Sequence, residues 1–117
     1  KASPYITDAV VIGDRKPYLT AIIMVDHDNV EHFALSRDIR FTNYESLTRS
    51  QEVVDLIAAE VAAVNQRYAR VEQIKKFRLL GKKLTPEDEE VTPTMKLKRK
   101  LILDRYAPMI EAMYAEP

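Results

Sequence analysis

The sequence contains no cysteine and only two glycines, and these shortages exclude several kinds of functional site. Without cysteine, the chain has no disulfide, no thiol nucleophile and no zinc-finger site. A loop that holds a nucleotide phosphate needs several glycines, so that backbone N–H groups can approach the anion. Gly13 and Gly81 end two separate apolar runs. We therefore expect no Walker or Rossmann loop in this chain.

An excess of charge of one sign is also missing, because 18 basic residues balance 18 acidic residues. A net charge of zero gives no overall field that would draw the chain to nucleic acid or anionic lipid. The longest run of strong hydrophobes, residues 21–25, is far shorter than the ~18 residues that a membrane span requires. The lack of cysteine fits a reducing compartment, and we expect a cytoplasmic location.

Metal ligands and nucleophile motifs are equally scarce. His27 and His32 are five residues apart, whereas two ligands on one face of a helix are three or four residues apart. No G-x-S-x-G motif is present. We therefore expect no metal site and no serine nucleophile.

The residues that are present predict one domain, residues 1–117, because 46% of them are hydrophobic and can form a core. Two runs rich in β-branched residues, 5–12 and 18–25, flank a short turn-forming connection and indicate an antiparallel hairpin. Residues 21–25 are apolar on both faces, which indicates an interior strand. Residues 74–80 are predicted to form a third strand.

Helical spacing predicts three helices, at residues 28–35, at residues 50–68 and from about residues 95–97 to 113. Pro108 should kink or restart the last of them. Residues 36–49 have no steady period and are interpreted as a loop, and the acidic run 87–90 as a solvated loop. The predicted fold class is α+β, with a small antiparallel sheet packed against three helices.

One basic segment departs from an ordinary globular surface. Lys96, Lys98, Arg99 and Lys100 occupy four of five consecutive positions, shortly after the acidic run. A solvated helix start is the ordinary interpretation. However, cations are disfavoured at the positive end of a helix dipole. Basic side chains placed there, beside free N–H groups, suit an anion, and phosphate is the natural candidate.

The segment Thr92-Pro93-Thr94-Met95-Lys96-Leu97-Lys98-Arg99 resembles the C-terminal signature of long-chain fatty-acyl-CoA synthetases, which are acyl-adenylate-forming (AMP-binding) enzymes. It keeps the K-x-x-R spacing of that superfamily at Lys96 and Arg99 and lacks the Ser-Gly pair that precedes the lysine in most members. Residues 6–14 and 18–23 resemble the first strand pair of the family's mobile C-terminal subdomain, so the resemblance extends over essentially the whole chain.

The resemblance implies the role of a lid in a two-step reaction. Such enzymes join a fatty acid to ATP, which gives acyl-AMP and pyrophosphate, and then transfer the acyl group to coenzyme A. Lys96 would be the catalytic lysine, between the carboxylate and the α-phosphate. Thr94, Lys98 and Arg99 would support phosphate binding. The lid would rotate between the two steps, so that another face closes the coenzyme A channel.

The same resemblance implies ATP, coenzyme A and Mg²⁺ as ligands of a full-length enzyme, with none of them bound by this chain alone. The expected partner is the enzyme's own N-terminal AMP-binding domain, which with the hinge would precede Lys1. The chain would then be a fragment without ligase activity. Because the substrate is a fatty acid, contact with a membrane is expected only peripherally, at its inner face, and no nucleic-acid partner is expected.

Two other functions stay open at this point. The chain could be an independent module whose basic patch, residues 96–100, binds nucleic acid or anionic lipid. The zero net charge and the shortage of aromatic residues near the patch argue against nucleic acid, because a base-stacking surface interleaves aromatic and basic residues. A purely structural or oligomerisation domain is the third possibility.

Overall fold

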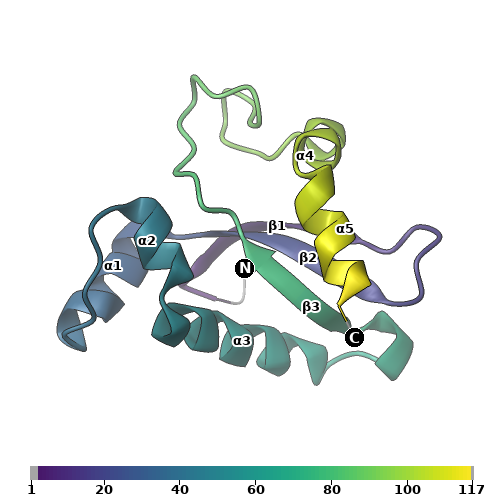
Figure 1. Ribbon diagram of the computed structural model, residues 1–117, viewed down its shortest axis with the longest axis horizontal. Helices are drawn as coiled ribbons and strands as arrows, with labels where there is room; N and C mark the ends of the chain where they lie inside the picture. The colour runs from purple at the N-terminus through teal and green to yellow at the C-terminus, as the bar shows by residue number, and fades with distance from the viewer. Residues whose placement is uncertain (1–2, 117) are drawn as a thin grey trace.

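A computed structural model describes residues 3–116, which form a three-stranded sheet in the order β1-β2-β3 (Figure 1). β1 (Ile6–Ile12) and β2 (Leu19–Val25) pair as an antiparallel hairpin, and β3 (Ile74–Leu79) lies parallel to β2. The predicted hairpin and third strand are confirmed. The sheet is mixed and not wholly antiparallel, because the chain reaches β3 through a helical crossover, which brings it back to the starting end of β2.

The described residues form five α-helices and one short 3-10 helix: α1 (His27–Ser36), α2 (Tyr44–Arg49), α3 (Gln51–Asn65), η1 (Arg70–Glu72), α4 (Arg99–Arg105) and α5 (Ala107–Ala115). The α+β class is confirmed, although there are more helices than the three predicted. α2 lies in the segment interpreted as a loop, where Asn43 and Ser46 form a capping box. Pro108 sits in the first turn of α5 and restarts the last helix as predicted.

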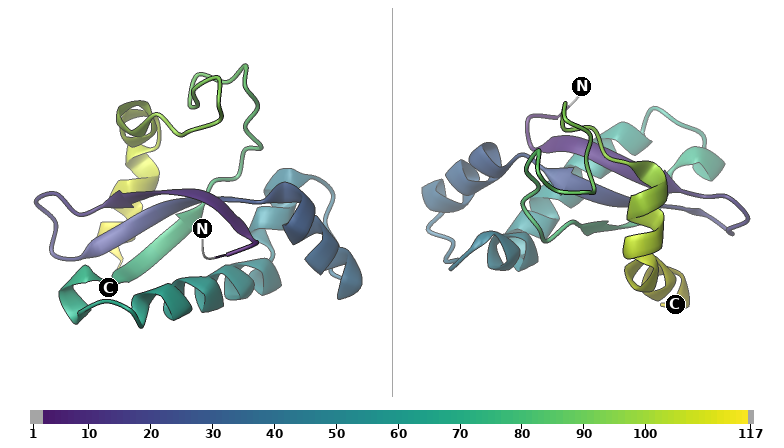
Figure 2. Two further views of the ribbon diagram at one scale, coloured as in Figure 1. Left: turned by 180° about the vertical axis from the view of Figure 1, so that it is seen from behind. Right: turned by 90° about the horizontal axis from the view of Figure 1, so that it is seen from above.

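The core lies on both faces of the sheet, because neighbouring residues of β2 point to opposite sides. Ile22 packs in a buried cluster with side chains of α4 and α5, such as Ile102 and Met113. Ile23 packs in a second cluster, with residues of α1, α2 and α3 that include Ile57. Figure 2 shows these two groups of helices on opposite sides of the strands. The prediction that residues 21–25 form an interior strand is confirmed.

A long irregular segment, residues 80–98, connects β3 to α4 and extends away from the sheet (Figure 1). Leu80, Leu84 and Val91 are buried in the same cluster as α4 and α5, so hydrophobic packing fixes the course of this segment. It carries Lys96 and Lys98, whereas Arg99 and Lys100 begin α4. No described helix has the length and apolar character needed to cross a bilayer.

Candidate functional site

Lys96 lies in a tight hairpin formed by residues 91–97, here called the lysine hairpin. Val91 and Leu97 form an antiparallel bridge at its base. The Thr92 N–H donates to the Lys96 carbonyl at 2.8 Å, and the Lys96 N–H donates to Thr92 Oγ1 at 3.1 Å. Met95 completes the turn with a φ of 68°, in the left-handed region. The backbone of Lys96 is therefore held by two hydrogen bonds to Thr92.

The side chain of Lys96 is exposed to solvent. Within residues 3–116 its ammonium group makes no ion pair or side-chain hydrogen bond with another residue. An exposed cation on a fixed backbone is free to neutralise an anion that is presented from outside the chain. The role predicted for Lys96 needs an exposed cation, and that role stays a prediction.

The other predicted site residues support the hairpin to different degrees. Thr94 Oγ1 lies 3.1 Å from Thr92 Oγ1, inside the turn. Lys98 is exposed, and its N–H donates to the Glu90 carbonyl at 2.8 Å, just outside the bridge. The Arg99 guanidinium donates to the Val11 carbonyl on β1 at 2.6 Å. The structure thus brings Thr94 close to Lys96, whereas Arg99 fastens α4 to the sheet. Phosphate binding by these three residues stays a prediction.

The last helical segment begins later than predicted, at Arg99 and not at residues 95–97. The lysine hairpin uses the backbone groups of residues 91–97, and Lys98 has an extended conformation as the N-cap of α4. The argument from the helix dipole therefore applies to Lys98, Arg99 and Lys100 at the start of α4 and not to Lys96.

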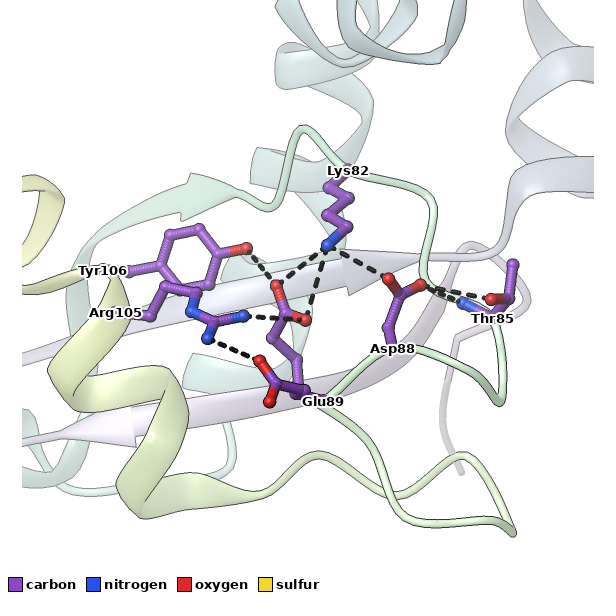
Figure 3. Close-up of polar contacts among 7 residues, drawn as sticks. Lys82, Thr85, Asp88, Glu89, Arg105 and Tyr106 are labelled. Carbon is purple, nitrogen blue, oxygen red and sulfur yellow. Dashed lines mark hydrogen bonds and ion pairs between the residues drawn. The ribbon is translucent and has the colours of Figure 1, made fainter.

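A buried carboxylate, that of Glu90, directly precedes the lysine hairpin in the chain, and Figure 3 shows Lys82, Asp88, Glu89, Arg105 and Tyr106 gathered around it. Glu90 is only 1% exposed, so the interpretation of residues 87–90 as a solvated loop is wrong for Glu90. Its carboxylate accepts a hydrogen bond from Tyr106 Oη at 3.0 Å and pairs with Lys82 Nζ and with Arg105 Nη1, each at 3.3 Å. Asp88 and Glu89 extend this cluster, at 3.1 Å from Lys82 and 3.0 Å from Arg105. These six residues are here called the Glu90 cluster.

Within the Glu90 cluster, folding favours the carboxylate forms of Glu90 and Asp88 and the ammonium form of Lys82. Burial raises the pKa of Glu90, but hydrogen bonds from its own N–H, from Tyr106 and from Lys82 outweigh burial and bring that pKa below its usual value. The Thr85 N–H and then Lys82 lower the pKa of Asp88, and Asp88 in turn raises the pKa of Lys82. Burial and then Glu90 raise the pKa of Tyr106.

These shifts predict a stability that falls in acid. A carboxyl group whose pKa is depressed by folding stabilises the chain fully above its unfolded pKa, and this contribution disappears as the pH falls through the folded pKa. For Glu90 and Asp88 the reference values are 4.5 and 3.8. We expect the urea midpoint of the chain to drop between pH ~5 and ~3, and to drop less steeply in Glu90→Gln.

Circular dichroism at several pH values measures these midpoints. Glu116→Gln is the control, because the pKa of Glu116 is also lowered, by Arg78, but the side chain is 53% exposed and its ion pair is screened by solvent. Relative to the unmodified chain, the pH dependence of the urea midpoint should change less in this control than in Glu90→Gln. Parallel pH profiles for Glu90→Gln and the unmodified chain would contradict the expectation.

A cavity of about 620 Å³ opens beside the Glu90 cluster, and its lining includes Phe77, Arg78, Lys82 and Tyr106. Neither Lys96 nor the other predicted site residues line it. Within residues 3–116, no three His, Cys, Asp or Glu side chains are grouped so that they could hold a metal ion. Lys96, the predicted catalytic residue, therefore lies on the lysine hairpin and outside this cavity.

Little in the sequence could have revealed the Glu90 cluster. Its acidic members are consecutive, and a run of like charges is normally solvated. Their partners are eight residues earlier, at Lys82, and some sixteen residues later, at Arg105 and Tyr106. Only the packing of α4 against residues 80–98 brings these groups together.

Comparisons with known proteins point to the same family as the signature in residues 92–99. The whole chain, residues 1–117, matches the family described as "AMP-binding enzyme C-terminal domain". It is 40% identical over 114 residues to the fadD11 protein of Mycobacterium tuberculosis, which is named as a fatty-acid–CoA ligase. It is 35% identical over 115 residues to the long-chain-fatty-acid–CoA ligase FadD15 of the same organism. Each alignment covers 97% of this chain.

The chain spans about a fifth of the length of these curated relatives, 20% of fadD11 and 19% of FadD15.

Among solved structures, the adenylation domain of a carboxylate reductase from Mycobacterium chelonae has a similar fold, with a TM-score of 0.68 at 23% identity. The match covers 97% of this chain and 16% of that one. The corresponding domain from Segniliparus rugosus, solved with AMP and a co-purified carboxylic acid, gives a TM-score of 0.57 at 21% identity, covering 97% of this chain and 16% of that one.

Proposed function

Because the chain belongs to the family of AMP-binding enzyme C-terminal domains, we propose that it is the C-terminal lid of a long-chain fatty-acid–CoA ligase. The observation that carries this proposal is the exposed ammonium group of Lys96 on a hydrogen-bonded hairpin, within the signature segment of residues 92–99. Identities of 35% and 40% to fatty-acid–CoA ligases support the choice of substrate and reaction. The alternative of a nucleic-acid or lipid-binding module has no support, and Arg99 of its basic patch is directed to the backbone of β1.

In the first half-reaction, a carboxylate oxygen of the fatty acid attacks the α-phosphorus of ATP, and pyrophosphate leaves. Negative groups crowd together at this step, so a cation aimed at the reacting oxygens lowers the barrier. Lys96 supplies that cation between the carboxylate and the α-phosphate. Its compact ammonium group suits a contact shared between two oxygens.

In the second half-reaction, the thiol sulfur of coenzyme A attacks the acyl carbonyl of acyl-AMP, and AMP leaves. The lid rotates beforehand, so that Lys96 withdraws and another face of the domain closes the coenzyme A channel. Thr94 holds the turn through Thr92, and Lys98 and Arg99 add positive potential at the base of the hairpin.

The ligands and the partner follow from this role. ATP, coenzyme A and the fatty acid bind at the interface with the enzyme's N-terminal AMP-binding domain. Mg²⁺ would accompany ATP on that domain, held largely by the phosphates of ATP. The cytoplasmic location and the peripheral contact with a membrane stay predictions.

The proposal is tested by dividing the enzyme that contains this chain. Acyl-CoA formation from fatty acid, ATP and coenzyme A is measured for the full-length enzyme, for the enzyme without this domain and for the isolated 117-residue chain. We expect activity only in the full-length enzyme, because neither part alone holds both Lys96 and the bound substrates. Ligase activity of the isolated chain, or full activity without this domain, would overturn the proposal.

A further inference from the structure

We infer that Glu90 is a positioning residue, which fixes the base of the lysine hairpin by joining it to both ends of α4. The inference rests on the proposed function, because the purpose of the positioning is to present Lys96. Glu90 does not reach Lys96 and makes no contact with its ammonium group in the described chain. Its effect on the reaction would be exerted through the backbone.

The first contact is made by the backbone of Glu90. Its carbonyl accepts the N–H of Lys98 at 2.8 Å, directly outside the bridge between Val91 and Leu97. Lys98 is also the N-cap of α4, and its own carbonyl accepts the Ile102 N–H at 3.0 Å. The backbone of Glu90 is therefore joined both to the hairpin and to the first turn of α4.

The second contact is made by the side chain, at the opposite end of the same helix. The carboxylate binds Tyr106 Oη at 3.0 Å and Arg105 Nη1 at 3.3 Å, and both residues stand at the C-terminal end of α4. Lys82, at the start of the segment 80–98, binds it from another direction at 3.3 Å. The buried residue Glu90 thus contacts both ends of the seven-residue helix α4. It also directly precedes the strand of the lysine hairpin that leads to Lys96.

The surrounding charges explain why a carboxylate is needed. Lys82 and Arg105 each bind a second, more exposed carboxylate, of Asp88 and Glu89 respectively. The Arg105–Glu89 pair is open to solvent, since Glu89 is 77% exposed, and screening weakens it; the Lys82–Asp88 pair is partly shielded, since Asp88 is 22% exposed. The carboxylate of Glu90 is buried. Loss of its charge would leave Lys82 and Arg105 without the buried anion that both of them bind.

The test uses Glu90→Gln in the full-length enzyme, since glutamine keeps the shape of the side chain and removes its charge. We expect the adenylation rate to fall about ten- to a hundredfold at unchanged KM for ATP, since misplacement of a reacting group mainly slows the chemical step. Acyl transfer from supplied acyl-AMP should stay within about twofold. Glu89→Gln is the matched control, because it removes an adjacent carboxylate that is 77% exposed and binds the same arginine.

Two further readouts separate positioning from a general loss of structure. Hydrogen exchange of residues 91–98 should be faster in Glu90→Gln, with exchange in β1, β2 and β3 unchanged. The double variant Lys96→Ala/Glu90→Gln should adenylate no more slowly than Lys96→Ala alone, because Glu90 acts through Lys96. If Glu90→Gln does not fold, Tyr106→Phe removes a single 3.0 Å hydrogen bond and serves the same test with a smaller effect.

The outcomes distinguish this inference from the proposed function. Normal adenylation by Lys96→Ala would overturn both, because there would be no catalytic lysine to position. A slow Lys96→Ala enzyme combined with a normal Glu90→Gln enzyme would overturn only the inference. Equal losses in both half-reactions, additive effects in the double variant or faster exchange throughout the sheet would also overturn it, because each would mean that Glu90 stabilises the domain as a whole.

Discussion

Replacing Lys96 with alanine should slow adenylation by about 10²–10³-fold, which is the usual effect of removing one preorganised group that stabilises charge in a transition state. The fold should be preserved. The Lys96 side chain is exposed, and the hydrogen bonds of this residue within the lysine hairpin are made by its backbone N–H and carbonyl, which alanine retains. The loss would therefore come from chemistry and not from packing.

Measuring the two half-reactions separately makes this expectation specific. Pyrophosphate release in a single turnover reports adenylation, and thioester formation from supplied acyl-AMP reports the second step. The second step should be affected much less, because the proposed rotation of the lid withdraws Lys96 before that step. Lys83→Ala is a suitable control, since Lys83 is an exposed lysine in the same segment, residues 80–98. Equal losses in both steps of the Lys96→Ala enzyme would contradict the assigned role.

The sequence was most informative where local pattern and tertiary environment agree. The two hairpin strands were predicted from β-branched runs, residues 74–80 were predicted as a third strand, and the pattern of residues 21–25 indicated burial on both faces. The parallel direction of β3 could not be predicted in the same way, because it depends on how the chain returns after α3. α2 was missed because a six-residue helix is too short to show a period, although Asn43 and Ser46 do form a capping box.

The candidate site shows the same division between local and distant information. Lys96 was found from a contiguous signature, and the structure adds that its backbone belongs to a hairpin and not to a helix. Glu90 lies in the neighbouring acidic run, yet its burial depends on Arg105 and Tyr106 at the far end of α4. Charge patterning describes a solvated run well and cannot indicate which member of the run has distant partners.

Replacing Ile22 with alanine should lower the free energy of unfolding by about 2–5 kcal/mol, which is the usual cost of removing a large buried aliphatic side chain and leaving a cavity. Ile22 is fully buried in the central strand β2. A small domain has a total stability of about 5–15 kcal/mol, so this loss is a large share of it. Urea unfolding followed by circular dichroism gives the change, with Leu35→Ala as a control at a residue that is 63% exposed.

The position of Ile22 also predicts which part of the domain weakens first. Ile22 belongs to the cluster that holds Leu80, Leu84 and Val91 together with α4 and α5, whereas Ile23 faces the helices on the other side of the sheet. Hydrogen exchange in Ile22→Ala should therefore rise more in residues 80–98 than in α3, and Ile23→Ala should show the reverse. The same increase on both sides of the sheet would contradict this, and it would mean that the two clusters unfold as one unit. If the two sides do respond separately, the order of the lysine hairpin depends on the hydrophobic cluster beneath it as well as on Glu90.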